Sequence, residues 1–200
     1  LIGHNTVRAQ VMNRDDRKPT VQEQQKMDAL VDQAMKEGAV GLSTGLIYIP
    51  GTYAETEEVI ALAKAAAKNK GVYASHIRNE ENQAVEAVNE AINIGKEASI
   101  PVQISHFKIG GRSNWGKSDI TLNLVKEARE NGWDVTIDQY PYTASSTNLG
   151  IRLPDWAFAG GNDSLKARLN NPLIRAQIKK EMLAQLAGYK FPNYSYAVVA

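Results

Sequence analysis

Four stretches of the chain place apolar residues on one side of a predicted helix. In the first of them, Met27, Leu30, Val31 and Met35 recur with the three- and four-residue spacing of a one-sided helix. The pattern predicts helices at residues 20–37, 54–70, 82–98 and 119–131.

Residue types at the ends of these stretches agree with this prediction. Thr20 and Glu23 have the spacing of a capping box, which predicts where the first helix begins. Gly38, Gly71 and Gly132 each follow a helix, where a residue with left-handed backbone commonly ends the last turn.

Short apolar runs lie between the helices and are typical of strands. Four of them occupy residues 39–42, 72–75, 102–105 and 134–137, and a fifth strand is predicted at residues 1–8. Valines 40, 72, 102 and 135 mark the four runs and stand 32, 30 and 33 residues apart. Because one strand-plus-helix unit takes about 30 residues, the rhythm predicts a parallel sheet covered by helices.

Five such units fit either an open doubly wound sheet or part of a (β/α)8 barrel. A complete barrel needs about 250 residues, whereas this chain shows five strands in roughly its first 140. We favour an α/β fold that is part of a TIM-type barrel, with barrel strands missing on both sides. The chain opens without methionine and closes on 197–200, which resembles a strand cut short, so we expect a fragment.

The end of the chain departs from the repeat. Residues 143–200 contain a loop, a Trp- and Gly-rich turn at 155–161 and a predicted helix at 172–186. We therefore divide the chain into an incomplete barrel portion, residues 1–142, and a loop and small helical insertion, residues 143–200, that leads toward a missing last strand.

Composition narrows the function classes. The net charge is +1 with 22% charged residues and no block of one sign, so we expect no nucleic-acid partner. No apolar run approaches the ~20 residues of a membrane span, so we expect no membrane partner and a cytoplasmic protein. The chain has no cysteine, which excludes disulfides and thiolate ligands from within it.

The candidate chemistry lies at the ends of the predicted strands. His76 and His106 each follow a serine at a strand end and stand 30 residues apart, one β/α unit. Equivalent positions on successive strands would bring both imidazoles to one rim of the sheet, where they could hold a zinc ion. The alternative is a pair of hydrogen-bonded histidines that bind nothing. Two ligands are too few for such a site, so others must come from outside the chain.

Other polar residues follow the same strand ends. Lys108 would point the same way as His106 if the strand continues, which suits a substrate carboxylate, although a solvated lysine is the commoner case. Tyr48 lies in a glycine-rich loop, where its hydroxyl could donate to substrate or the ring could pack the loop. Tyr140 could line the pocket; Asp138 could orient a neighbour or, less expected, bind metal. We expect His4 to hydrogen-bond at the rim without a catalytic role.

Read together, several segments resemble the D-aminoacylase family of the amidohydrolase superfamily. The matching segments lie between residue 2 and about residue 160, at 3–8, 41–51, 75–80, 105–108 and 138–144. The resemblance implies a zinc-bearing barrel of the metal-dependent hydrolase kind that cleaves N-acyl-D-amino acids to a carboxylate and a free D-amino acid. It also implies that His76 and His106 bind the metal and that Tyr48, Lys108 and Tyr140 contact the substrate.

The resemblance also implies what the chain lacks. The family's upstream His-x-His pair and metal-binding cysteine, and its downstream catalytic aspartate and carboxylate-binding arginine, have no counterpart here. We therefore expect no general acid or base within this chain, an inactive isolated chain, and self-association through unpaired barrel edges. A cyclic-amide hydrolase of the dihydroorotase or hydantoinase type remains an alternative, although the strand tip before His76 offers Ser43 and Thr44 instead of the lysine such enzymes carry.

Overall fold

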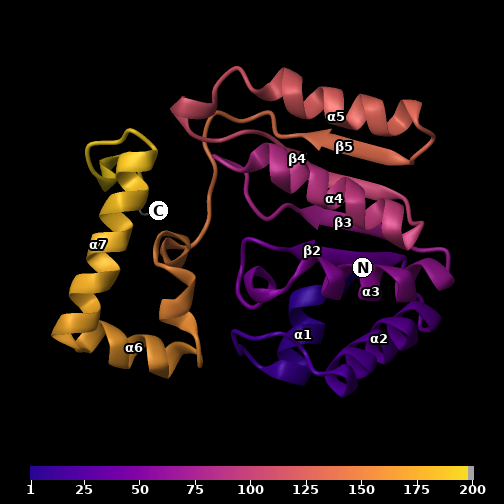
Figure 1. Cartoon of the computed structure of the whole chain (residues 1–200), viewed down its shortest axis with the longest axis horizontal. Helices are drawn as coiled ribbons and strands as arrows, with labels where there is room; N and C mark the ends of the chain where they lie inside the picture. Colours follow the sequence, from indigo (N-terminus) through magenta and orange to yellow (C-terminus); the bar gives the residue numbers. More distant parts are fainter. Residues whose placement is uncertain (198–200) are drawn as a thin grey trace.

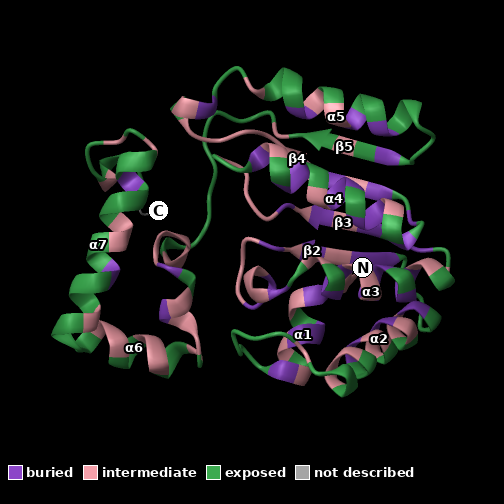
Figure 2. Cartoon of the chain, viewed as in Figure 1, coloured by how far each residue is buried: buried purple, intermediate pink, exposed green. Residues whose placement is uncertain are grey.

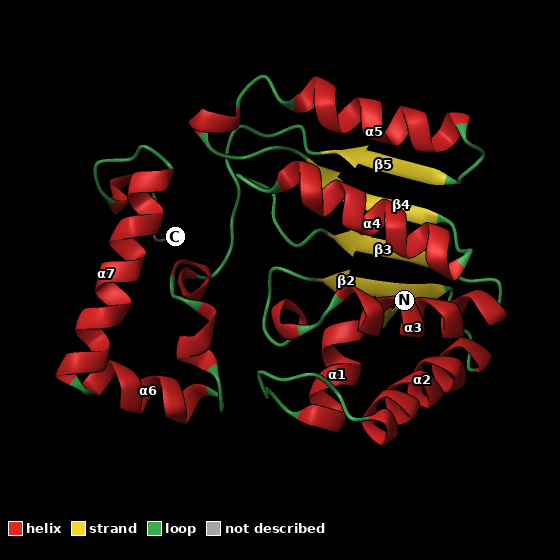
Figure 3. Ribbon diagram, viewed as in Figure 1, coloured by secondary structure: helices red, strands yellow, loops and turns green. Residues whose placement is uncertain are grey.

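A five-stranded parallel sheet forms the centre of the computed structural model, which describes residues 1–197 (Figures 1 and 3). Each strand lies beside the strand that precedes it in the chain, in the order β1-β2-β3-β4-β5. A doubly wound sheet would reverse its strand order at a switch point. The order found here is that of an arc of a barrel. The strands are β1 (Ile2–Gly3), β2 (Gly41–Gly45), β3 (Val72–His76), β4 (Val102–Phe107) and β5 (Val135–Gln139).

The predicted helices connect these strands. They are α2 (Val21–Lys36), α3 (Thr56–Lys68), α4 (Ala84–Ala98) and α5 (Ser118–Glu130). Helix α3 contacts α2 on one side and α4 on the other, and α4 also contacts α5, so these helices form a layer against the sheet. The predicted capping box is present: Thr20 accepts the amide N–H of Glu23, and Glu23 accepts that of Thr20.

The core lies between the sheet and this helical layer. Leu42, Tyr73 and Ile104 of the strands are fully buried, as are Leu62 and Ala63 of α3. Buried positions gather where helices meet strands, while β5 and the C-terminal helices are largely exposed (Figure 2). Helix α4 packs so closely against β4 that a Cβ atom added at Gly95 would lie 2.1 Å from Val102 Cγ2.

The predicted strand at residues 1–8 is wrong beyond its third residue. Strand β1 ends at Gly3, and α1 (His4–Met12) begins at once. The buried residues of α1 are His4, Val7, Arg8 and Met12, a spacing that puts them on one helical face. Because two of the four buried positions are His and Arg, the apolar residues alone did not show the helical period.

Two of the three glycine caps are confirmed. Gly38 and Gly132 have φ of +108° and +85°, whereas at the end of α3 it is Lys70, with φ +59°, that takes the left-handed conformation. Gly71 serves another purpose, because a Cβ there would lie 2.6 Å from Met35 Cε and 3.2 Å from Gly41 Cα. Its lack of a side chain permits close packing.

The last quarter of the described chain stands beyond the C-terminal ends of the strands (Figure 1). It contains α6 (Asn162–Asn170) and α7 (Pro172–Gly188), the latter confirming the predicted helix. Helix α6 was not predicted, because none of its residues is buried and so no apolar stripe marks it. The predicted strand at 197–200 falls almost wholly outside the described residues. Within the part of the chain that the structure describes, no helix has both the length and the hydropathy to cross a membrane.

Candidate metal and substrate site

The ends of β2 to β5 open into a cavity of about 320 Å³ that the C-terminal segment closes from the other side. Tyr48, His76, His106, Lys108 and Tyr140 all line this cavity. These are the five residues that the sequence and the family resemblance assigned to the metal and the substrate, and the structure brings all of them together. The far wall comes from residues 145–155 and from α7.

His76 and His106 face each other across neighbouring strands. The distance from His76 Nδ1 to His106 Nε2 is 2.8 Å, and the ring centroids lie 4.5 Å apart at an interplanar angle of 76°. Strands β3 and β4 pair in parallel with Ser75 opposite Ile104. The one-unit spacing of the two histidines therefore becomes a direct contact.

His76 is held as a neutral imidazole. Burial lowers its pKa to about 4, and the electrostatic interactions with His106 and Lys108 act in the same direction. Its Nε2 atom is buried and has no hydrogen-bond partner among the described residues. Neutral imidazole is the form that binds metal ions, since the ligand nitrogen must carry a free electron pair.

The donor set fits a zinc ion. In the contact between His76 Nδ1 and His106 Nε2, at least one of the two nitrogens directs its lone pair toward the other. Two nitrogen ligands of one tetrahedral zinc ion lie about 3.3 Å apart, which is only slightly more than the distance between these two atoms. Ligand atoms of His76, His106 and Glu80 all lie within 4.8 Å of one another. Two imidazoles with a carboxylate alongside are ordinary zinc chemistry.

Glu80 is a site residue that the sequence did not reveal. Its Oε1 atom accepts a hydrogen bond from Lys108 Nζ at 2.6 Å and lies 3.1 Å from His106 Nδ1. Lys108 Nζ also lies 3.0 Å from His106 Nδ1, so the carboxylate and the ammonium group together hold this side of the imidazole while Nε2 faces His76. The one indication in the sequence that Glu80 belongs to the site was its position four residues after His76.

Asp138 holds the backbone of His106. His106 has a left-handed φ of +41°, at an irregularity in the register between β4 and β5. This conformation costs a non-glycine residue about 1–3 kcal/mol. The amide N–H of His106 donates to Asp138 Oδ2 at 2.7 Å, and Gln103 donates to Oδ1 at 2.6 Å. Of the two possibilities for Asp138, these contacts are those of an orienting residue.

Aromatic rings and one cation flank the histidines. The ring of Tyr48 lies 5.1 Å from that of His76, and its hydroxyl is 3.3 Å from Thr147 Oγ1. The ring of Tyr140 lies 6.3 Å from that of His106, and Lys108 Nζ stands 4.7 Å from its centroid. A lysine held between a carboxylate and an aromatic face has a defined position in the cavity.

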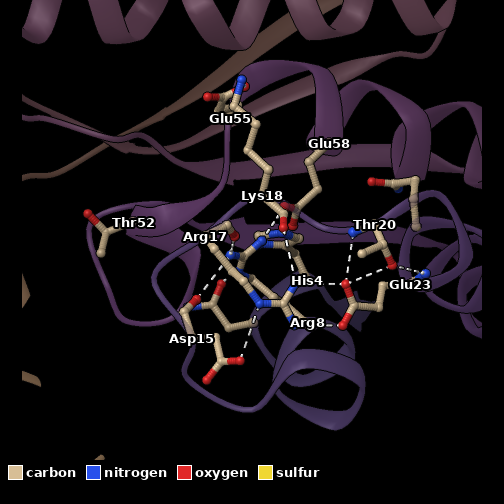
Figure 4. Close-up of polar contacts among 12 residues, drawn as sticks. His4, Arg8, Asp15, Arg17, Lys18, Thr20, Glu23, Thr52, Glu55 and Glu58 are labelled. Carbon is tan, nitrogen blue, oxygen red and sulfur yellow. Dashed lines mark hydrogen bonds and ion pairs between the residues drawn. The ribbon is translucent and has the colours of Figure 1, made fainter. Parts of the chain in front are cut away.

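His4 lies outside this cavity, and it hydrogen-bonds in the buried first turn of α1 instead of at the rim of the strands, where the sequence predicted it. It is fully buried, and its Nε2 atom is 2.8 Å from Glu58 Oε1. Arg8 binds the other oxygen of the same carboxylate, so a buried network links α1 to α3 (Figure 4).

Comparison with known proteins identifies relatives over most of the chain. A D-aminoacylase of Alcaligenes xylosoxydans xylosoxydans is 42% identical over 149 residues, which are 74% of this chain and 31% of the relative. No family model matches. Among solved structures, the crystal structure of a D-aminoacylase, described as defining a novel subset of amidohydrolases, superposes with a TM-score of 0.68 at 44% identity over 71% of this chain and 30% of that one.

A second solved structure is an N-acyl-D-glutamate deacylase from Bordetella bronchiseptica, complexed with zinc and a phosphonate inhibitor that mimics the tetrahedral intermediate. It has a TM-score of 0.68 at 42% identity, over 71% of this chain and 30% of that one. The chain thus spans slightly less than a third of the length of these relatives. The resemblance inferred from the sequence is confirmed, and the five-stranded sheet matches part of the TIM-type barrel of the amidohydrolases.

Proposed function

We propose that this chain, a homologue of the D-aminoacylases, carries part of the active site of an enzyme that hydrolyses N-acyl-D-amino acids to a carboxylate and a free D-amino acid. The observation that carries the proposal is the contact of His76 with His106 at 2.8 Å in the same cavity as Lys108. The alternative of a cyclic-amide hydrolase gains no support, because β2 (Gly41–Gly45) contains no lysine.

His76 and His106 would hold a zinc ion. When bound, zinc supplies Lewis-acid polarisation of the scissile carbonyl and a water of lowered pKa. Burial keeps His76 neutral and able to act as a ligand. Asp138 fixes the main chain of His106, and Glu80 lies against the imidazole nitrogen that faces away from His76.

Lys108, Tyr48 and Tyr140 would bind the substrate. The ammonium group of Lys108 lies 3.0 Å from His106 Nδ1 and suits the α-carboxylate of the amino acid. Tyr48 and Tyr140 flank the two imidazoles on opposite sides. Fixing the carboxylate at one point relative to the histidines orients the amide for attack. The same contact would let the site select the D-enantiomer of the substrate.

Proton transfer is assigned outside this chain. The catalytic aspartate implied by the family resemblance has no counterpart among these residues, so no general acid or base is assigned within them. We expect the isolated chain to be inactive for this reason. The division into residues 1–142 and 143–200 and the cytoplasmic location stay predictions.

The test is hydrolysis by the full-length protein. Purified protein should release free amino acid from N-acetyl-D-amino acids and not from the L-enantiomers. Removal of metal by a chelator should abolish release, and zinc should restore it. Equal rates on both enantiomers, or full activity after metal removal, would contradict the proposal.

A further inference from the structure

We propose that Asn5 is a positioning residue that sets the loop carrying Tyr48, and that it acts from outside the cavity. The loop comprises residues 45–51 and is called here the β2 loop. The inference builds on the proposed function, because it assigns to Asn5 an effect on substrate binding through Tyr48. Asn5 lies in the first turn of α1 and does not line the cavity.

The side chain of Asn5 hydrogen-bonds to both ends of the turn formed by residues 45–48 of this loop. Its amide nitrogen donates to the carbonyl oxygens of Gly45 at 3.3 Å and of Tyr48 at 3.2 Å. The turn is closed by a backbone hydrogen bond from Tyr48 N to Gly45 O at 3.0 Å. Both hydrogens of the Asn5 amide group are therefore donated to the turn whose backbone sets the position of the Tyr48 side chain.

The loop is shaped around this side chain. A Cβ at Gly51 would lie 2.5 Å from Asn5 Oδ1 and 2.9 Å from Gly45 O, so only glycine leaves room for the asparagine. At the start of the loop, a Cβ at Gly45 would lie 3.1 Å from the Tyr48 ring. The glycines noted in the sequence thus admit Asn5 on one side and Tyr48 on the other.

Asn5 lies next to a buried network of polar side chains that joins α1 to α3. Its Oδ1 atom is 3.3 Å from Nδ1 of His4, whose other nitrogen binds Glu58 at 2.8 Å. Arg8 binds the second oxygen of Glu58 and donates to the carbonyl oxygen of Arg17 at 2.7 Å (Figure 4). His4, Arg8 and Glu58 are all buried, so α1 and α3 hold the asparagine in a fixed place.

On its other side the loop touches the candidate metal site. The amide N–H of Leu46 donates to the carbonyl oxygen of His76 at 3.1 Å, and the Tyr48 ring lies 5.1 Å from the His76 ring. Losing the Asn5 amide would leave the Gly45 and Tyr48 carbonyls without their side-chain donor. The backbone from which Tyr48 extends would then lose a constraint that the contact of its hydroxyl with Thr147 Oγ1 does not replace.

A double-mutant cycle in the full-length zinc-loaded enzyme tests this inference. Asn5→Ala should reduce kcat/KM for an N-acetyl-D-amino acid by about tenfold, the loss expected for one or two hydrogen bonds. In a Tyr48→Phe background the same change should cost less than about twofold, because the hydroxyl that Asn5 positions is gone. Equal losses in both backgrounds, or no loss in either, would overturn the inference.

Matched variants separate positioning from general destabilisation. Asn69 also uses its amide nitrogen on a backbone carbonyl, that of Ala65, and on Asp32, far from the loop. Asn69→Ala should leave KM and kcat unchanged. If Asn5→Ala does not fold, Asn5→Asp keeps the side-chain shape and the oxygen facing His4 but removes both donors, and the same cycle is run with it.

Hydrogen exchange gives a readout that does not depend on activity. In Asn5→Ala or Asn5→Asp protein, the amide of Tyr48 in the β2 loop and that of Thr52, which follows the loop and donates to Tyr48 O, should exchange faster, while those of α3 stay protected. Unchanged exchange in the loop would overturn the positioning role. If the wild-type protein hydrolyses no N-acyl-D-amino acid but the loop exchange rises as expected, the proposed function fails and the structural role of Asn5 stands.

Discussion

His76 and His106 meet because two different backbone conformations aim them at one point. His76 ends the regular strand β3, whereas His106 takes a left-handed φ of +41° next to a register irregularity. Asp138 stabilises that conformation through the amide N–H of His106. The contact between the two imidazoles therefore depends on Asp138 as well as on the two histidines.

The first residue-scale prediction concerns zinc. Replacing both histidines in His76→Ala/His106→Ala should remove most of the zinc from the purified full-length protein, because two ligands are lost. Glu80→Gln should weaken zinc binding by about 10- to 100-fold, as for other groups that orient a ligand. Metal content by mass spectrometry and a competition titration measure these changes. Unaltered zinc in the double variant would show that the ligand assignment is wrong.

The second residue-scale prediction concerns Lys108, the residue proposed to bind the substrate carboxylate. Lys108→Met should lower kcat/KM by about 10- to 100-fold, since a hydrogen bond to a charged group contributes about 1.5–3 kcal/mol. The loss should appear mainly in KM. Lys64, an exposed lysine on α3, provides the control, and Lys64→Met should behave as wild type. A Lys108→Met enzyme with normal KM would argue against the assigned role.

At the scale of elements, α1 and α3 are joined by a buried cluster of charge. Burial alone would raise the pKa of Glu58, but hydrogen bonds from His4 and Arg8 outweigh it and hold that pKa below its usual range. The carboxylate therefore stabilises the fold above the pH at which it titrates in the unfolded chain. That contribution is lost as the pH falls through the lowered pKa of the folded state.

Glu58→Gln tests this coupling. Removing one partner of a buried ion pair costs about 3–5 kcal/mol, because it leaves the remaining charge without a partner. We expect a lower melting temperature than wild type at pH 7, and a difference that shrinks as the solution is acidified below about pH 4, where the unfolded carboxyl titrates. Thermal melts over a pH series measure both. Equal melting temperatures at pH 7 would mean that the pair contributes nothing net.

At the scale of the whole molecule, the sheet has an open edge. Within the described residues no strand pairs with the outer side of β5, and much of that strand is exposed (Figure 2). Unpaired strand edges promote association between chains. The 200-residue chain expressed alone should therefore self-associate, as measured by light scattering. A monodisperse, thermally robust monomer would contradict this prediction.

The sequence by itself determined the repeating fold and the rim on which the site lies. Helical periodicity located α2 to α5, because each buries one stripe of side chains in the core that covers the sheet. The spacing of 30 to 33 residues placed His76, His106 and Lys108 at equivalent strand ends, since parallel strands share one direction.

Only the tertiary structure decided the rest. The repeat alone fitted both a barrel and a doubly wound sheet, and strand order, which local pattern does not encode, confirmed the favoured barrel. The helical start of α1, the contact of Glu80 with Lys108 and the place of Asn5 beneath Tyr48 each depend on polar groups that meet across elements. Hydrophobic periodicity reports which face of an element is buried. It carries no information on which polar partner a buried or half-buried side chain will find.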